Sequence, residues 1–272
     1  MKANMSRRSM LAGVGCAAAG SAVGQLLSVA RAQEAAQVKQ GQTGGICLTM
    51  IFEDGPKVKF DAAKYVQNHL PLLREVYGDS VERIEMRTAP EIDAGTRIIK
   101  TYRGMPVVRA ATTFWIKDVA AFGQKLTANA DRVNKDLDAV AKGNRLVQPD
   151  RIVMALGDAH SAVGVGHHVF SVYFRPAAGI PAFDQRYFTE VFLPKQYSLF
   201  GTYAVRGLEA TVGMDQGGQK AVLLGAFHIF IRDRKVFEEE SGTAFVEIQE
   251  YTEKLTQNTM AVFNDMRVAG IA

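Results

Sequence analysis

Short apolar runs alternate with amphipathic stretches from residue 46 onward, and the same order of patterns occurs twice. In each half, a β-type run precedes a helical stretch, two further strand-like runs, a second helical stretch and a final strand. The predicted strands are 46–52, 81–88, 106–116 and 151–156 in the first half and 169–174, 205–212, 221–231 and 260–268 in the second. The pattern therefore predicts β-α-β-β-α-β in both halves.

Aspartate, glycine and proline residues mark the predicted helices. Four aspartates precede them and are expected to act as N-caps: Asp61, Asp118, Asp184 and Asp233. Gly78 and Gly201 follow the last periodic residue of the first helix of each half, which predicts that they end these helices in the left-handed conformation. Pro71 and Pro194 lie inside the same helices and remove one backbone hydrogen bond, so we expect a kink or tighter last turns.

Two blocks of the first half recur in the second half at fixed spacing. Phe60-Asp61 and Leu70-Pro71 recur 123 residues later, and Ile116-Lys117-Asp118 recurs 115 residues later as Ile231-Arg232-Asp233. Shared spacing over separate blocks indicates a tandem duplication. The predicted halves are 46–156 and 168–272, joined by a Gly-, Ala- and Ser-rich linker at 157–167.

The order of elements predicts an α+β fold class. Two helices in β-α-β-β-α-β order pack on one face of a four-stranded antiparallel sheet, which is the ferredoxin-like arrangement. The other face of each sheet also carries apolar residues and needs cover. We therefore expect the two halves to pack sheet to sheet as a pseudo-dimeric α+β barrel within one chain.

Residues 1–32 have the pattern of a twin-arginine signal peptide. Arg7-Arg8 precedes an uncharged stretch, 10–30, and Ala30-Arg31-Ala32 forms a small-x-small cleavage site. The sequence thus predicts export to the periplasm, with a flexible segment at 33–45 in the mature protein. An uncleaved membrane anchor is the alternative, because about 20 apolar residues span a bilayer, although Ala and Gly insert poorly.

The basic character of the chain belongs to this first segment. Without residues 1–32, the protein has 28 basic and 28 acidic residues. That balance gives no reason to expect binding to nucleic acid. Contact with a membrane is expected only through an uncleaved signal.

Several classes of chemistry are not expected from this sequence. Cys16 lies in the signal, so Cys47 is alone in the mature chain and we expect a buried, inert thiol rather than a nucleophile. No His, Cys and carboxylate cluster has zinc-type spacing, and His167-His168 point to opposite faces of a strand. Nucleotide-binding glycine motifs and a nucleophile elbow are also missing from the sequence. No metal site is predicted.

The start of the first helix resembles the EthD family. Phe60-Asp61, Tyr65, His69 and Pro71 match that family's pattern, and Lys64 stands where the first of two paired tyrosines is usual. The resemblance covers about 45 residues, including Tyr77-Gly78 and 81–85. It implies a dimeric α+β barrel whose helix–sheet cleft takes small, often apolar organic molecules, and a link to oxidoreductase systems.

Tyr65 and His69 are the catalytic candidates. They are four residues apart, so they lie on one face of a helix. An imidazole exchanges protons near neutral pH and a phenol donates to a developing oxyanion, which suits proton transfer at a ketone, phenol or lactone. The second half carries Phe188 and Phe192 at these positions. We therefore expect one equipped cleft, in the first half.

Other residues were selected as substrate-binding candidates from their place in the predicted strands and helices: Trp115, Thr113, Met50, Thr49, Tyr187 and His228. Each has ordinary core packing as its alternative.

Three functions remain open from the sequence. The first is an exported, cofactor-independent enzyme of oxidoreductase or proton-transfer type that acts on a small organic molecule. The second is a periplasmic binding or accessory protein without turnover. The third is a haem protein resembling the dye-decolourising peroxidases, of whose Gly-x-x-Asp-Gly motif only Asp54-Gly55 is present.

Overall fold

The computed structural model describes residues 44–53, 59–89, 108–143, 145–157, 163–176, 183–216, 218–255 and 259–272. The predicted signal peptide and nearly all of the segment 33–45 lie outside these residues. Among the helices of the described part, none is both long enough and apolar enough to cross a membrane.

The first half contains four long strands and one layer of helices. Its strands are β1 (Ile46–Glu53), β3 (Val81–Thr88), β4 (Val108–Ile116) and β6 (Arg145–Gly157). Its helical segments are α2 (Ala62–Lys64), a π-helical turn (Tyr65–His69), α3 (Leu70–Tyr77), a 3-10 turn (Gly78–Ser80) and α4 (Val119–Val140). A small ladder joins β2 (Lys59–Phe60) to β5 (Ala141–Lys142).

The second half repeats this order of elements. Its strands are β7 (His168–Pro176), β8 (Val205–Gly213), β9 (Gly225–Ile231) and β10 (Thr259–Ile271). Its helical segments are α5 (Gln185–Tyr187), a π-helical turn (Phe188–Phe192), α6 (Leu193–Ala204) and α7 (Arg234–Leu255). The predicted strands are found in both halves, and the last strand of the first half begins six residues earlier than expected.

The eight long strands form one closed antiparallel barrel in the order β1-β4-β3-β10-β7-β9-β8-β6. Within each half, the order is that of a ferredoxin-like sheet. At both seams, the last strand of one half pairs with the second strand of the other: β6 with β8, and β10 with β3. The predicted pseudo-dimeric α+β barrel is confirmed.

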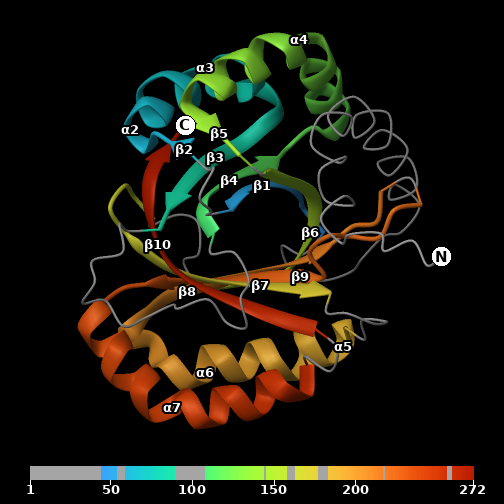
Figure 1. The fold of residues 1–272 in the computed structure, drawn as a ribbon. Helices are drawn as coiled ribbons and strands as arrows, with labels where there is room; N and C mark the ends of the chain where they lie inside the picture. Colours follow the sequence, from blue (N-terminus) through green and yellow to red (C-terminus); the bar gives the residue numbers. More distant parts are fainter. Residues whose placement is uncertain are drawn as a thin grey trace, which may run out of the picture.

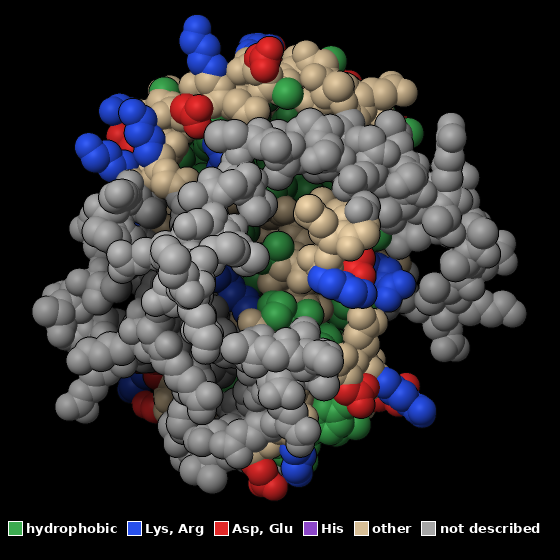
Figure 2. Space-filling view, turned by 45° about the vertical axis from the view of Figure 1, so that its right-hand side comes forward, with side chains coloured by type: hydrophobic (Ala, Val, Ile, Leu, Met, Phe, Trp, Pro, Cys, Tyr) green, Lys and Arg blue, Asp and Glu red, His purple; other side chains and the backbone are tan. Residues whose placement is uncertain are grey.

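The helices cover the outside of the barrel, with α3 and α4 on one side and α6 and α7 on the other (Figure 1). One core therefore lies between each helical layer and its half of the sheet, and each is lined by alternate strand residues. The other strand residues point into the barrel, where both halves contribute. In the view of Figure 2, charged side chains of the described residues lie mainly around the periphery and hydrophobic ones show near the centre.

The predicted helix starts are confirmed. The carboxylates of Asp61, Asp118, Asp184 and Asp233 each accept a hydrogen bond from the backbone N–H three residues later, at 2.9–3.1 Å. This contact satisfies one of the free donors of the first helical turn.

The predicted helix ends are confirmed only in part: α3 ends at Tyr77, directly before Gly78, but Gly78 is not left-handed and α6 does not end at Gly201. Gly78 has right-handed backbone angles, φ −47° and ψ −41°, and begins a 3-10 turn, in which Ser80 Oγ donates to the carbonyl of Tyr77 at 2.7 Å. Helix α6 continues through Gly201 to Ala204, whose carbonyl accepts a backbone hydrogen bond from Arg232 at 2.8 Å. A 3-10 turn thus follows Gly78 in place of a left-handed cap, and α6 runs three residues past Gly201.

The proline in each first helix is accommodated by a wider turn instead of a tighter one. A five-residue π-helical turn ends two residues before Pro71, and an equivalent one ends two residues before Pro194. Proline removes a donor from the helical ladder, and the i→i+5 bond from Leu70 N–H to the Tyr65 carbonyl shifts the register just before it. The π turn of the first half contains both catalytic candidates, Tyr65 and His69.

Candidate functional site

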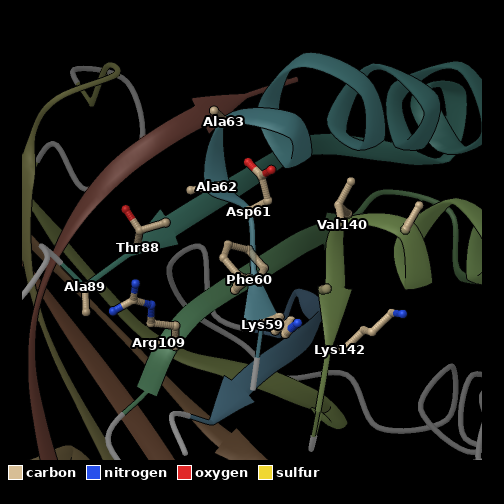
Figure 3. Close-up of a pocket in the computed structure, with 12 residues that line it drawn as sticks. Lys59, Phe60, Asp61, Ala62, Ala63, Thr88, Ala89, Arg109, Val140 and Lys142 are labelled. Carbon is tan, nitrogen blue, oxygen red and sulfur yellow. The ribbon is translucent and has the colours of Figure 1, made fainter. Parts of the chain in front are cut away.

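A cavity of about 870 Å³ opens in the first half between the β2–β5 ladder, the start of α2 and the ends of β3 and β4 (Figure 3). Its apolar wall includes Phe60, Ala62 and Val140, and its polar wall includes Lys59, Arg109 and Lys142. The cavity lies at the helix–sheet layer in which the sequence predicted a cleft.

Phe60 links this cavity to the interior of the helix–sheet layer. It pairs with Ala141 in the β2–β5 ladder, which fixes its backbone. Its ring centroid lies 4.9 Å from that of Phe52 and 5.4 Å from that of Tyr65. Aromatic pairs at such separations are favourable, so Phe60 forms both part of the cavity wall and the cover of Tyr65.

Tyr65 lies behind Phe60 and has no exposed surface. Its hydroxyl oxygen is 2.7 Å from Thr112 Oγ1 on β4, and either oxygen can donate. Burial raises the pKa of Tyr65 well above its ordinary value, so the phenol keeps its proton. It is therefore equipped to donate a hydrogen bond and not to act as a base.

His69 lies next to Tyr65, with ring centroids 4.8 Å apart, and pairs with a carboxylate. Its Nδ1 is 2.6 Å from Asp136 Oδ2 on α4. Its side chain is fully enclosed, and its Nε2 is buried without a hydrogen-bond partner among the described residues. Burial lowers the pKa of His69, although Asp136 opposes this shift. The neutral ring then donates from Nδ1 to Asp136 and presents Nε2 as a proton acceptor.

The second half lacks this pair of polar groups. Its π turn places Phe188 and Phe192 where the first half has Tyr65 and His69. The second long helices, α4 and α7, both have 22 residues, and Tyr251 on α7 stands where α4 has Asp136. All three polar groups are thus specific to the first half.

The structure does not bring all the predicted site residues together. Met50 packs in the helix–sheet core of the first half with Tyr65. Thr49, Thr113 and Trp115 belong to the alternate positions of β1 and β4, which face the barrel interior. The sheet therefore separates these three from His69.

His228 and Tyr187 lie elsewhere again. His228 faces the barrel interior on β9, and its Nδ1 is 3.0 Å from Ser171 Oγ. Tyr187 packs against the helix–sheet core of the second half. Neither residue lines the cavity of the first half.

The barrel interior is polar for a buried space. Trp115 Nε1 donates to Glu209 Oε2 at 3.0 Å, and Glu85 pairs with Arg83 and Arg87. Burial raises the pKa of Asp150 to about 7. It also raises the pKa of Cys47, which is fully buried in agreement with the prediction of an inert thiol.

The cavity wall does not fit haem. Haem iron takes an axial ligand such as His, Cys, Met or Tyr from the protein, and none of the described residues lining the cavity is of these types. Asp54-Gly55 lies outside the described residues. Among the residues that the structure describes, no three His, Cys or carboxylate side chains are grouped as metal ligands.

The fold is shared with solved structures of dimeric α+β barrel proteins. An anthrone oxidase-like protein is 10% identical with a TM-score of 0.54, covering 86% of this chain and 95% of its own. A proposed monooxygenase from Fusobacterium nucleatum is 12% identical with a TM-score of 0.52, covering 85% and 95%.

An EthD-like protein from Ralstonia eutropha JMP134 is 13% identical over 37% of this chain and 90% of its own, with a TM-score of 0.33. No family model and no curated protein matches the sequence. At these identities, the similarity of the first two structures shows the fold alone.

Four charged groups of this site were not predicted from the sequence. Asp136 sits on a helix with several charged residues and has no motif around it. Lys59, Lys142 and Arg109 lie at strand ends with no pattern of their own. The repeat spacing of 115 residues, which aligns α4 with α7, could have pointed to Asp136. At this spacing Asp136 aligns with Tyr251, so the carboxylate is present in the first half only.

Proposed function

We propose that the chain is an enzyme of oxidoreductase or proton-transfer type that acts on a small, largely apolar organic molecule in the helix–sheet cleft of the first half. The observation that carries this proposal is the contact of His69 Nδ1 with Asp136, at 2.6 Å, while Nε2 is buried and has no hydrogen-bond partner among the described residues. A neutral imidazole fixed in this way is a proton acceptor.

In the proposed reaction, His69 Nε2 takes a proton from a hydroxyl or an activated C–H group of the substrate. The resulting imidazolium is stabilised by the carboxylate of Asp136, and Tyr65 donates a hydrogen bond to the oxygen that gains charge. The proposal needs no bound cofactor. Trp115, Thr113, Thr49 and His228 take no part in this step because the sheet separates them from His69.

Access to His69 depends on Phe60. Tyr65 and His69 are fully enclosed, whereas Phe60 lines the cavity and packs on Tyr65. We infer that the Phe60 ring moves when a substrate enters, so that the cavity and the buried pair become continuous.

The test compares wild-type protein with a double variant, Tyr65→Phe and His69→Phe. This variant gives the first half the side chains that the second half carries in its own π turn, so we expect it to fold. Purified proteins are incubated with a panel of phenols, anthrones, ketones and lactones, and products and oxygen uptake are measured. We expect turnover by wild type and a loss of about 10²-fold or more in the variant.

Tyr187→Phe is the matched control, because it removes a tyrosine hydroxyl from the second half, and it should leave turnover unchanged. Equal turnover by wild type and the double variant would contradict the proposal.

A binding protein without turnover is the second candidate. The full enclosure of His69 favours it, because a catalytic base must reach its substrate. It predicts tight retention of a panel compound, detected by native mass spectrometry, with no product in any variant.

The proposal includes export of the protein to the periplasm. It rests on the twin-arginine pattern of residues 6–11, which lie outside the described residues. Replacing both Arg7 and Arg8 by Lys should leave the unprocessed chain in the cytoplasm on cell fractionation. An unchanged periplasmic fraction would contradict this.

A further inference from the structure

Two exposed lysines occupy opposite positions of a small ladder at the cavity. Lys59 and Lys142 are directly paired in the antiparallel β2–β5 ladder, and both line the cavity (Figure 3). Like charges directly opposite each other destabilise an antiparallel pair. Neither lysine has an ion-pair partner among the described residues. None of the residues that the structure describes therefore relieves this repulsion.

Arg109 brings a third positive charge to the same cavity. It lies near the start of β4 and is half-buried, and its guanidinium has no hydrogen-bond or ion-pair partner in the described part of the chain. In Figure 3 the guanidinium lies beside Thr88 and Ala89. The three cations come from three different strands, so no single local pattern predicts that all three line one cavity.

The carboxylate at the cavity does not neutralise these charges. Asp61 is the acidic residue among the described lining. It accepts from the backbone N–H of Lys64 at 3.0 Å and pairs with Lys64 Nζ at 3.1 Å. Its charge is engaged by the helix start and by Lys64, so among the described lining residues no carboxylate pairs with Lys59, Lys142 or Arg109.

The rest of the described wall is mainly apolar. It includes Phe60, Ala62, Ala63, Val140 and Ala141, and Phe60 also packs against the rings of Phe52 and Tyr65. An aromatic ring offers a flat apolar surface to a ligand. The cavity thus combines an aromatic wall with positive charge that none of the described residues compensates.

We propose that the ligand of this cavity is an organic anion. A flat apolar body lies against Phe60, and an anionic oxygen group, a carboxylate, phenolate or sulfonate, lies near Lys59, Lys142 and Arg109. This inference rests on the proposed function in that it assigns a substrate class to the same cavity. Bound anion offsets the repulsion between the paired lysines.

Two dyes with one aromatic body test the proposal. 8-Anilinonaphthalene-1-sulfonate carries a sulfonate, and N-phenyl-1-naphthylamine is the same body without it. We expect the sulfonate dye to bind the full-length purified protein about tenfold more tightly than the neutral dye in fluorescence titrations at low salt.

Charge-removing variants locate the binding. The double variant Lys59→Gln with Lys142→Gln, and separately Arg109→Gln, should raise the Kd of the sulfonate dye by about fivefold or more and leave that of the neutral dye within about twofold. Phe60→Ala should weaken both dyes. Lys235→Gln is the control, because Lys235 is an exposed lysine on α7 of the second half.

A variant with one reversed charge tests whether weaker dye binding results from misfolding. Lys142→Glu converts the like-charge pair into an opposite-charge pair, which is favourable in an antiparallel ladder. It should weaken the sulfonate dye while the melting temperature of the dye-free protein stays the same or rises.

Equal affinities for the two dyes, absence of binding by the sulfonate dye, or the same loss with Lys235→Gln would each overturn the proposal. Its failure is distinguishable from failure of the proposed function through His69→Phe. If the protein binds the sulfonate dye selectively but His69→Phe does not change turnover, only the enzyme proposal is contradicted. If His69→Phe abolishes turnover but the two dyes bind equally, only the organic-anion proposal is contradicted.

Discussion

The indole Nε1 of Trp115 donates a hydrogen bond to Oε2 of Glu209 across the barrel interior, at 3.0 Å. Trp115 belongs to β4 of the first half and Glu209 to β8 of the second. Both side chains are almost fully buried. This contact therefore joins the two halves through a buried hydrogen bond inside the barrel.

Removing the donor of this contact should destabilise the protein. Trp115→Phe keeps an aromatic ring but takes one donor from a buried carboxylate, which costs about 1–3 kcal/mol. Chemical denaturation measures the free energy of unfolding. The double variant with Glu209→Gln should lose less than the sum of the two single variants. Strict additivity would show that the two residues are not coupled.

The pKa of His69 should lie below its ordinary value of 6.5. Burial disfavours the charged imidazolium, and Asp136 favours it. Asp136→Asn removes the favourable carboxylate, so it should lower the pKa of His69 further, which an NMR titration of the imidazole protons measures. Asp131→Asn, an exposed change on the same helix, is the control. A rise of the His69 pKa in Asp136→Asn would contradict the described contact.

Stability should fall with rising pH through Asp150. Its pKa is about 7 in the folded protein against an ordinary value of 3.8, because burial disfavours the carboxylate. The folded state therefore binds more protons between these values, and its stability relative to Asp150→Asn drops by at most about 1.4 kcal/mol per pH unit. Urea unfolding at pH 4 and pH 7.5 checks this. A difference between the two proteins that does not change with pH would refute it.

Gly213 should not tolerate a side chain. It lies at the end of β8, opposite Asp150 of β6, and an added Cβ would come within 1.9 Å of the Leu223 carbonyl oxygen. Backbone at that distance must shift, so Gly213→Ala should cost about 1–3 kcal/mol or more of unfolding free energy. Gly45→Ala is the matched control, because its Cβ would meet only the flexible end of Ile152 at 3.2 Å. Equal melting temperatures for both variants would contradict the packing described at this seam.

The parts of the fold that follow from local chemistry were predictable. Aspartate caps such as Asp61 and Asp118 accept from backbone donors only three residues away, so local sequence is enough to predict them. Strands can be predicted from their content of apolar and β-branched residues. The helix ends were predictable only in part. Helix α3 ends before Gly78 as expected, whereas α6 continues past Gly201 to Ala204, whose carbonyl accepts a hydrogen bond from Arg232 far along the chain.

The candidate site was predictable only in part. The pair Tyr65 and His69 could be found because the second half offers Phe188 and Phe192 for comparison. The face of the sheet on which Trp115 and Thr113 lie could not be predicted. Both faces are buried, so the sequence shows no alternation of polar and apolar residues that would tell the barrel interior from the helix side. The duplication itself stays a prediction, although both halves share the order of their elements.

The two seams of the barrel decide how the halves depend on each other. Because β6 completes its hydrogen bonding on β8 and β10 does so on β3, a half alone would expose two rows of unsatisfied backbone groups. Each half thus covers the free strand edges of the other. If the chain were cut between Gly157 and Val163, both ladders would stay in place, and the two pieces should remain associated.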